Sequence, residues 1–228
     1  MKTESSKYAF RIDEINQNST HGKILSKVEP GSKVLELGCA SGYMTKYLHE
    51  KLNCTVHVVE IDEECIKQAV EYADDAQCGN LDEDIWYGYY SREKYDYILF
   101  ADVLEHLRDP LHTLTMAGKL LKENGRILIS IPNICHNDIL IRMFYDNFTY
   151  TSLGLLDRTH IHFFGGNNLP EFVESADLKL ESIECLMMKT GTTEQRCDPE
   201  QIDKELLELL KKRQLGEVYQ YILVCRKG

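Results

Sequence analysis

Two carboxylates and a run of small residues are spaced along the early part of the chain as a nucleoside-binding site requires. Gly38 and Gly42 enclose small residues between a predicted strand and a predicted helix, where the backbone can turn sharply and approach a ligand closely. The spacing is G-x-x-x-G, so the third glycine of the dinucleotide fingerprint is missing, which speaks against an NAD-dependent oxidoreductase. Glu36, two residues before the first glycine, would repel a pyrophosphate but suits a ligand with an ammonium group.

A second carboxylate, Glu60, ends the next predicted strand, 22 residues after Gly38. An acid at this place can accept hydrogen bonds from ribose hydroxyls. Together, Glu36 and Glu60 indicate a nucleoside that has no phosphate and carries positive charge, and S-adenosylmethionine has the ribose, the ammonium and the sulfonium. The glycines alone would suit any tight turn between a strand and a helix, so the two acids carry the interpretation.

Histidines that follow predicted strand ends are candidates for a general base, because a neutral imidazole can take the proton of a hydroxyl acceptor near neutral pH. They are His106, His136, His160 and His162. If the segment around His106 turns as a helix, His106 shares one face with Asp102 and Glu105, which favours it as a base with a carboxylate beside it. His160 and His162 alternate, so in extended backbone only one of them faces the site, and we expect it to be His160.

Each of these candidates has a structural alternative. Asp157 precedes His160 and is the third candidate catalytic residue, but it would equally suit a structural ion pair with Arg158. His106 would equally suit a solvated or capping position. We expect most of the aromatic side chains at 144–150 and 163–164 to pack a lid onto the sheet.

The elements that position these residues alternate between short apolar runs and amphipathic stretches. This rhythm predicts an α/β fold with a parallel sheet and helices on both faces. Predicted strands cover 33–37, 54–61, 76–78, 95–101, 126–131, 178–188 and 218–226, and predicted helices cover 42–52, 62–73, 110–121, 167–176 and 199–213.

We expect a single domain over residues 1–228, because no linker or change of composition divides the chain. Residues at about 134–166 interrupt the alternation, and they are expected to form a lid or substrate region beyond the strand ends. Residues 190–198 are expected to form a mobile loop.

The composition excludes several classes of partner. The 228 residues carry a formal net charge of −11, which argues against nucleic acid because an acidic surface repels phosphate. No apolar run approaches the ~18 residues that span a bilayer, and the first residues lack the apolar stretch of a signal peptide. The eight cysteines form no C-x-x-C pair and lie mostly in apolar runs, as buried thiols do in a reducing compartment. We therefore expect a cytoplasmic protein with no membrane partner.

The sequence resembles class I S-adenosylmethionine-dependent methyltransferases over about residues 30–133. The matching segments are VLELGCASGY at 34–43, VVEIDEE at 58–64, GNLD at 79–82, YDYILFADVLEHLRDP at 95–110 and LKENGRILISIPN at 121–133. The resemblance implies a doubly wound, seven-stranded, mostly parallel Rossmann-like methyltransferase fold with strand order 3-2-1-4-5-7-6 and an antiparallel last strand. Ala40 stands where many members have glycine, and its methyl group is tolerable there if φ is negative.

The resemblance also implies roles for individual residues toward the cofactor. The methionine portion would lie against the turn backbone, the ribose against Glu60, the adenine beside Ile61 and residues 80–81, and the sulfur above residues 101–103. The cofactor-binding residues implied in this way are Glu36, Gly38, Cys39, Ala40, Gly42, Tyr43, Glu60, Ile61, Asn80, Leu81, Ala101, Asp102 and Val103.

Two further segments resemble a bacterial subgroup associated with polysaccharide and glycosyltransferase clusters. They are NSTH at 18–21 and GLLDRTH at 154–160, the latter followed by Phe163 and Phe164. This resemblance implies methyl transfer to an oxygen acceptor, a sugar or glycan hydroxyl. The alternatives are a small-molecule O-methyltransferase of quinone or phenol type and a catalytically silent cofactor-binding partner protein. A homodimer is compatible with each of them.

Asp102, Glu105, His106 and His160 also resemble the acid-x-x-Glu-His set that binds a divalent metal in small-RNA 2′-O-methyltransferases and ubiquinone-pathway O-methyltransferases. Such a cation would lower the pKa of the acceptor hydroxyl. We do not expect a metal here, because the first acid of the set is Asp, whose side chain has the shorter reach.

Overall fold

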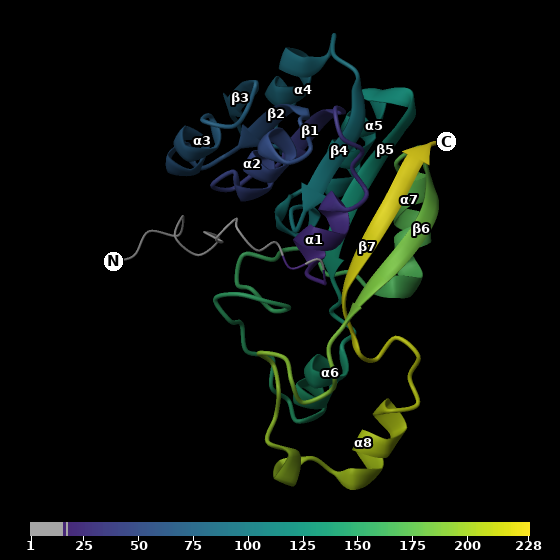
Figure 1. The fold of residues 1–228 in the computed structure, drawn as a ribbon. Helices are drawn as coiled ribbons and strands as arrows, with labels where there is room; N and C mark the ends of the chain where they lie inside the picture. Colours follow the sequence, from purple (N-terminus) through teal and green to yellow (C-terminus); the bar gives the residue numbers. More distant parts are fainter. Residues whose placement is uncertain (1–15, 17) are drawn as a thin grey trace.

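The computed structural model describes residue 16 and residues 18–228, which fold around a seven-stranded sheet (Figure 1). The strands are β1 (Lys33–Leu37), β2 (Thr55–Glu60), β3 (Asp75–Cys78), β4 (Tyr95–Ala101), β5 (Leu121–Pro132), β6 (Leu178–Met187) and β7 (Val218–Lys227). Their order is β3-β2-β1-β4-β5-β7-β6, with β1 to β5 parallel and β7 antiparallel to both of its neighbours. The predicted fold class, strand order and antiparallel last strand are confirmed.

Helices cover both faces of this sheet, which explains why its central strands are apolar runs without alternation. The helices are α1 (Thr20–Leu25), α2 (Tyr43–Glu50), α3 (Glu63–Ala69), α4 (Ile85–Tyr90), α5 (Pro110–Lys119), α6 (Asn137–Phe144), α7 (Leu169–Ser175) and α8 (Lys204–Leu210), with 3-10 turns at Leu104–His106, Gly166–Asn168 and Pro199–Gln201. Side chains of α1, α2 and α3 share one buried cluster with one face of the sheet. Side chains of α4, α5 and α7 share another with the opposite face.

Side-chain caps fix where two of these helices begin. Asp62 accepts hydrogen bonds from the backbone N–H groups of Glu64 and Cys65 at the start of α3. Asp109 caps α5, whose first residue is Pro110, a residue that needs no N–H donor there. The predicted helices at 62–73 and 199–213 are too long. The helix α3 ends at Ala69, and α8 covers only Lys204–Leu210 after a 3-10 turn at Pro199–Gln201.

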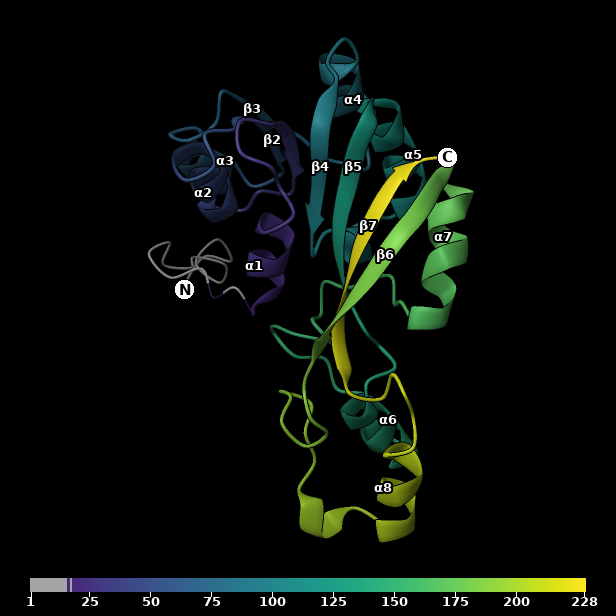
Figure 2. The same ribbon diagram turned by 45° about the vertical axis from the view of Figure 1, so that its right-hand side comes forward.

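A lobe lies beyond the carboxyl ends of the parallel strands and contains α6 and α8 (Figures 1 and 2). Residues 134–165, which follow β5, form one part of it, and residues 188–217, which join β6 to β7, form the other. The two parts share a buried cluster to which Ile141 of α6, Leu210 of α8 and Ile202, which precedes α8, contribute. The segment expected as a lid is therefore only one part of this lobe.

Residues 190–198 are anchored in the lobe, so the expectation of a mobile loop is wrong for its central part. Asp138 of α6 accepts hydrogen bonds from the backbone N–H of Gly191 at 2.6 Å and from the hydroxyl of Thr193 at 2.7 Å. Thr193 and Gln195 are fully buried. A buried carboxylate with several donors holds the segment against α6.

Candidate functional site

The turn between β1 and α2 requires glycine at two positions. Gly38 and Gly42 both have φ of 79°, in the left-handed region. A Cβ on Gly38 would lie 2.6 Å from a methyl group of Val103, and one on Gly42 would lie 2.6 Å from the backbone of Ala69. The backbone of this turn therefore lies directly against α3 and the end of β4, where a side chain would not fit.

Ala40, between these glycines, has φ of 47°. The sequence argument that its methyl group is tolerable assumed a negative φ, and this assumption is wrong. A left-handed alanine is strained by roughly 1–2 kcal/mol, because Cβ approaches the following carbonyl oxygen. A hydrogen bond from the backbone N–H of Ala40 to Glu60 Oε2, at 2.8 Å, holds the residue in this conformation.

Glu60 is 9% exposed at the end of β2 and binds backbone groups on both sides. Its Oε1 accepts hydrogen bonds from the N–H groups of Ile61, at 2.8 Å, and Asp62, at 3.0 Å, in addition to the bond from Ala40 to Oε2. A carboxylate has about four acceptor sites, so three are used within the chain. The carboxylate is thus held in place with about one acceptor site left for a further donor, which suits the expected ribose hydroxyl.

Glu36 lies beneath the turn and is 2% exposed. Its Oε2 accepts a hydrogen bond from the hydroxyl of Thr45 on α2, at 2.7 Å. Burial raises the pKa of Glu36 to about 8, while the Thr45 hydroxyl opposes and the Glu60 carboxylate reinforces this shift. A cationic ligand group near Glu36 would favour its charged form, which suits the expected position beside an ammonium.

The expected adenine end of the cofactor site lies beyond Glu60. Ile61 is 65% exposed although it is apolar, and Leu81 is 7% exposed. Asn80 is partly exposed, and its side-chain oxygen accepts a hydrogen bond from the N–H of Asp82, which closes the loop after β3. The exposed apolar side chain beside a fixed carboxylate fits a nucleoside, with the base against Ile61 and the ribose at Glu60.

Asp102 follows β4 and adopts φ of 56°. Its Oδ1 accepts hydrogen bonds from Ser130 Oγ of β5, at 2.6 Å, and from Gln220 Nε2 of β7, at 2.9 Å. Three neighbouring strands therefore fix this carboxylate at the carboxyl edge of the sheet. Ala101 ends β4 before it, and Val103 after it packs against the glycine turn.

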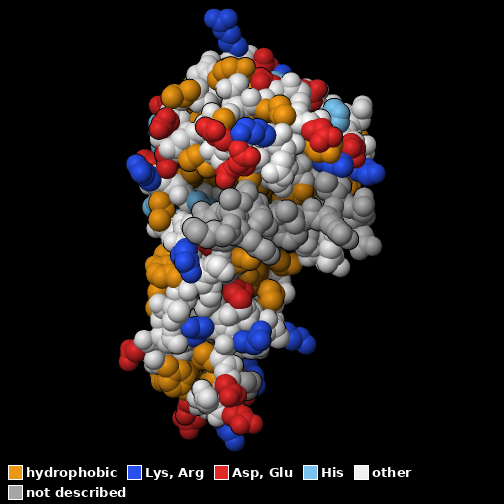
Figure 3. Space-filling view, turned by 90° about the vertical axis from the view of Figure 1, so that its left-hand side faces the viewer, with side chains coloured by type: hydrophobic (Ala, Val, Ile, Leu, Met, Phe, Trp, Pro, Cys, Tyr) orange, Lys and Arg blue, Asp and Glu red, His pale blue; other side chains and the backbone are white. Residues whose placement is uncertain are grey.

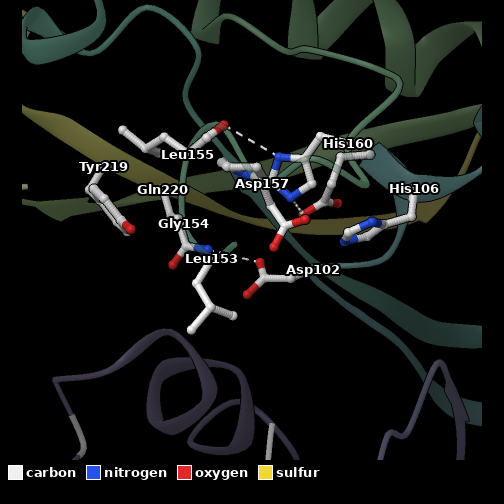
Figure 4. Close-up of a pocket in the computed structure, with 11 residues that line it drawn as sticks. Asp102, His106, Leu153, Gly154, Leu155, Asp157, His160, Tyr219 and Gln220 are labelled. Atoms are coloured by element: carbon white, nitrogen blue, oxygen red, sulfur yellow. Dashed lines mark hydrogen bonds and ion pairs between the residues drawn. The ribbon is translucent and has the colours of Figure 1, made fainter. Parts of the chain in front are cut away.

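Asp102 is shared between the expected cofactor site and a small pocket on the side of the lobe (Figure 4). The two candidate bases His106 and His160 line this pocket together with acidic residues that follow β4 or belong to the lobe. The lining residues are Asp102, Glu105, His106, Pro132, Leu153, Gly154, Leu155, Asp157, His160, Tyr219 and Gln220. The three predicted catalytic residues, His106, Asp157 and His160, thus meet in one pocket from two segments distant in sequence.

Both imidazoles in the pocket donate through Nδ1 to backbone carbonyls. His160 Nδ1 lies 3.3 Å from Leu155 O, and His106 Nδ1 lies 3.2 Å from Thr159 O. These bonds assign the neutral tautomer with a lone pair on Nε2 in each ring. Burial lowers the pKa of both imidazoles, and for His160 the neighbouring His106 lowers it further. Both rings are therefore suited to accept a proton or to ligate a cation.

Glu105 lies close to these histidines, with both carboxyl oxygens buried and without a hydrogen-bond partner among the described residues. Burial raises its pKa well above the usual range, and the carboxylates of Asp102 and Asp157 add to this. Its Oε1 lies 3.9 Å from His160 Nε2. A buried polar group of this kind is unusual, which makes Glu105 a candidate for a functional position.

One ligand atom from each of Glu105, His106 and His160 lies within 4.8 Å of the others. Two imidazoles and a carboxylate form a donor set that binds divalent transition metals, and the unpartnered oxygens of Glu105 fit such an ion. Asp102 lies outside this group, because Ser130 and Gln220 hold its carboxylate. Of the four residues that the sequence indicated as possible metal ligands, the structure therefore groups three.

Asp157 is 3% exposed, and its Oδ1 accepts hydrogen bonds from the N–H and the hydroxyl of Thr159, at 2.8 and 2.6 Å. It stabilises the turn that presents His160, rather than pairing with Arg158. His136 is fully buried and bonds Met188 O, outside the pocket. His162 bonds Arg108 O and does not line the pocket either.

Six pocket residues were not assigned to the site from the sequence. They are Pro132 at the end of β5, Leu153, Gly154 and Leu155 of the lobe, and Tyr219 and Gln220 of β7. The sequence signal that could have indicated this strand as part of the site was the polar Gln220 among apolar residues, because a polar side chain removed from water needs a specific partner. The same signal applies to Ser130 in β5, which is fully buried and donates to Asp102.

On the face drawn in Figure 3, Lys and Arg side chains are scattered among Asp and Glu rather than gathered in one basic area. Among residues 18–228, no helix combines the length and the apolarity needed to cross a membrane.

Known proteins resemble this chain in both sequence and fold. Residues 12–183 match the model of a methyltransferase domain family. The chain is 28% identical over 125 residues to malonyl-[acyl-carrier protein] O-methyltransferase of Anoxybacillus flavithermus, covering 53% of this chain and 46% of that protein. It is 25% identical over 156 residues to ubiquinone biosynthesis O-methyltransferase of Coxiella burnetii, covering 67% of this chain and 66% of that protein. The chain thus spans less than two thirds of the length of these curated relatives.

A solved structure shares the fold over nearly its whole length. It is a SAM-dependent methyltransferase from Archaeoglobus fulgidus, with a TM-score of 0.60, 17% sequence identity and coverage of 92% of both chains. The family match extends from before α1 into β6, and so includes every strand that contributes to the expected cofactor site. Because this match covers most of the sequence, the chain belongs to the methyltransferase domain family.

Proposed function

We propose that this protein transfers a methyl group from S-adenosylmethionine to a hydroxyl oxygen bound in the pocket of Figure 4. The single observation that carries the proposal is the position of Asp102, which lines this pocket and also follows the strand that closes the expected cofactor site. A cofactor across the glycine turn would therefore reach the pocket without rearrangement of the sheet. The two relatives named above are both O-methyltransferases, which supports oxygen as the acceptor atom.

The bound cofactor supplies an already activated methyl group, so the protein has mainly to position the acceptor. The pocket residues would orient the hydroxyl, and Nε2 of His160 or His106 would take its proton. Glu105 lies beside His160 and Asp157 holds the turn that carries it, so we assign both as positioning residues. Asp157, predicted as catalytic, thus acts through His160.

We propose a sugar or glycan hydroxyl as the acceptor. The support is the sequence resemblance of the segments at 18–21 and 154–160 to the polysaccharide-associated subgroup, and residues 154, 155, 157 and 160 line the pocket. Neutral imidazoles and carboxyl groups around the pocket suit a polar acceptor. A phenolic acceptor of quinone type is the first alternative, since one relative is named for ubiquinone biosynthesis. A cofactor-binding partner protein without activity is the second.

A divalent cation is the second candidate for activating the hydroxyl. The unpartnered, buried oxygens of Glu105 favour it, and Glu105, His106 and His160 would hold the ion. Such an ion would supply a Lewis acid that lowers the pKa of the acceptor hydroxyl. In that case the two imidazoles would bind the cation instead of the proton.

The acceptor is tested by transfer of labelled methyl from S-adenosylmethionine to nucleotide sugars, oligosaccharides and catechol-type phenols. We expect label in a saccharide; label in phenols alone would replace the saccharide proposal, and no transfer to any hydroxyl would support the silent partner. His106→Ala and His160→Ala should slow turnover with cofactor affinity unchanged, whereas His162→Ala, outside the pocket, should not. Full activity after treatment with a strong chelator would exclude the cation.

We also propose a cytoplasmic location. All eight cysteines are free in the structure, as expected in a reducing compartment. A homodimer stays a prediction, to be tested by sedimentation.

A further inference from the structure

The pocket of Figure 4 gathers three carboxyl groups, and none of the described residues that line it is a lysine or an arginine. Asp102 and Glu105 follow β4, whereas Asp157 comes from the lobe. In Figure 4 the side chains of Asp102 and Asp157 point toward one another. Carboxyl groups brought together without a cation repel each other when they are charged, so the lining favours a ligand that carries positive charge.

Glu105 gives an independent indication of a ligand in this pocket. Its side chain is fully buried, and neither carboxyl oxygen has a hydrogen-bond partner among the described residues. The nearest candidate, Nε2 of His160, lies 3.9 Å from Oε1, which is too far for a hydrogen bond. Since buried polar groups are nearly always hydrogen-bonded, a donor that belongs to the ligand is needed at Glu105.

The other side chains of the pocket present acceptors as well. The hydrogen bonds that described residues donate to Asp102 and Asp157 all go to Oδ1, which leaves Oδ2 of each without such a bond. Nε2 of both imidazoles carries a lone pair. The hydroxyl of Tyr219 donates to Glu194, and the amide of Gln220 donates to Asp102, so both donors are already used.

This excess of acceptors selects among the groups that an acceptor molecule can carry beside its hydroxyl. A phosphate or a carboxylate is negative and only accepts hydrogen bonds, so the pocket would reject it. A hydroxyl alone supplies a single donor. A protonated primary amine is positive and has three N–H donors, and its hydrogen bonds to carboxylates are among the strong ones in proteins.

The spacing of the acceptors also suits an ammonium group. One atom from each of Glu105, His106 and His160 lies within 4.8 Å of the others, and the pair of Glu105 and His160 is 3.9 Å apart. A tetrahedral ammonium that donates over about 2.8 Å separates its acceptors by about 4.6 Å. A tetrahedral metal with ligands at about 2.1 Å separates them by about 3.4 Å, so this pair would have to close by about 0.5 Å.

We propose that the acceptor carries a protonated primary amine next to the methylated hydroxyl, as an amino sugar does, and that Glu105 binds this amine in the pocket. The inference rests on the proposed function and deepens it by naming the class of acceptor. When the ammonium donates to Glu105 and one imidazole, the other imidazole stays available to take the proton of the hydroxyl.

Methyl transfer to matched sugars tests this on the full chain, at pH 7 and with a strong chelator present. The acceptors are the methyl glycosides of glucosamine, galactosamine and mannosamine, each compared with its N-acetyl derivative and with the parent hexose. We expect kcat/KM for at least one amino sugar to exceed that of both of its neutral partners by about ten-fold or more, as expected for a charge-assisted hydrogen bond. Mass spectrometry should place the methyl group on oxygen.

Variants show whether Glu105 carries this preference. Glu105→Gln keeps the shape of the side chain but removes its charge, and it should reduce the preference for the amine over the N-acetyl partner to less than about two-fold. The matched control is Glu123→Gln, an exposed acid at the other end of β5 from the pocket, which should keep the preference. A purely structural role of Glu105 would slow transfer to all of the sugars equally.

Several outcomes would overturn the inference while methyl transfer itself stands. They are a preference for neutral sugars or phenols, a methyl group on the amine nitrogen, a preference for the amine that survives in Glu105→Gln, and activity that appears only when a divalent metal replaces the chelator. Binding of S-adenosylmethionine without transfer to any of the nine sugars would overturn it too. If calorimetry shows no binding of S-adenosylmethionine at all, the proposed function fails, and the inference falls with it.

Discussion

The backbone N–H of Ala40 donates a hydrogen bond to Glu60 Oε2 at 2.8 Å, which joins the glycine turn after β1 to the end of β2. The two residues belong to the two halves of the expected cofactor site, one against the methionine portion and one at the ribose. Neither half can move without disturbing the other. The Glu60 carboxylate therefore holds the backbone of the glycine turn and also offers an acceptor to a ligand.

Replacing Ala40 by glycine should stabilise the protein. The left-handed φ of 47° costs alanine roughly 1–2 kcal/mol, and the greater freedom of glycine in the unfolded chain offsets about half of that. We expect Ala40→Gly to raise the free energy of unfolding in urea by about 0.5–1 kcal/mol. Ala117→Gly, in the helical interior of α5, should lower it by about 1 kcal/mol or more. Equal losses in both variants would contradict the strain.

Removing the Glu60 carboxylate should weaken cofactor binding and loosen the turn together. Glu60→Ala leaves three backbone N–H groups without an acceptor and removes the site for the ribose hydroxyl. We expect a loss of about 1–3 kcal/mol in the binding free energy of S-adenosylhomocysteine by calorimetry. Glu63→Ala, on an exposed acid in the first turn of α3, serves as the control. Unchanged affinity in Glu60→Ala would contradict its assigned role.

Cofactor binding should release a proton from Glu36. Because its pKa is raised to about 8, Glu36 is mostly protonated at pH 7 in the free protein. A bound ammonium favours the carboxylate and lowers this pKa, so the proton leaves. Titrations at pH 7 in buffers of different ionisation enthalpy should show net release in the wild type compared with Glu36→Gln. If the wild type and Glu36→Gln released or took up the same number of protons on binding, Glu36 would not be the group that loses the proton.

The raised pKa of Glu36 also predicts how the stability of the free protein depends on pH. Since the folded pKa lies above the unfolded one, the folded state binds more protons between these values. The contribution of Glu36 is therefore fully present below its unfolded pKa and is lost as the pH rises toward about 8. Unfolding in urea from pH 5 to 8 should show a steeper loss of stability in the wild type than in Glu36→Gln; parallel curves would refute the shift.

The pocket wall depends on a glycine in the lobe. Gly154 has φ of 89°, and a Cβ there would lie 2.2 Å from Glu194 Oε1. Glu194 accepts hydrogen bonds from the N–H of Leu155, at 2.7 Å, and the hydroxyl of Tyr219, at 3.0 Å. Gly154→Ala should therefore lower the free energy of unfolding by about 1–3 kcal/mol more than Gly191→Ala, as Glu194 loses these bonds.

Gly191 is a matched control, because it has nearly the same φ, 86°, and an added Cβ there meets nothing within 4 Å. The difference between the two variants isolates the displacement of Glu194 from the strain of a left-handed alanine. Equal destabilisation would mean that Glu194 moves aside without consequence for the pocket wall.

The sheet was predictable from sequence because local patterns encode it. Apolar runs such as 33–37 and 95–101, in alternation with amphipathic stretches, predict strands buried on both faces, and the family resemblance supplied their order. The glycine turn, Glu36 and Glu60 were predictable for the same reason, since strand ends are visible in the sequence. The conformation of Ala40 was not, because its φ is set by Glu60 from another strand and by the close contact of Gly38 with Val103.

Only the part of the lobe at about 134–166 was predicted, because long-range contacts define the rest. Asp138 binds Thr193 across 55 residues, and nothing near either residue indicates the other. The helix α6 lies in a segment rich in aromatic residues, and the expectation that most of them pack a lid onto the sheet is wrong. Of these side chains only Phe164 is buried, and the others are 39–62% exposed: Phe144, Tyr145, Phe148, Tyr150 and Phe163. The hydroxyl of the pocket residue Tyr219 donates a hydrogen bond to Glu194, which lies in the segment 190–198 that was expected to be mobile. Buried polar residues in strands, such as Ser130, are the signal that could have located the pocket.

The most direct test of the central claim is a crystal structure of the protein with S-adenosylhomocysteine. The ribose should lie at Glu60, and the sulfur should face the opening beside Asp102 toward His106 and His160. A ligand whose sulfur points away from this pocket, or a crevice left empty at saturating ligand, would contradict methyl transfer at this site.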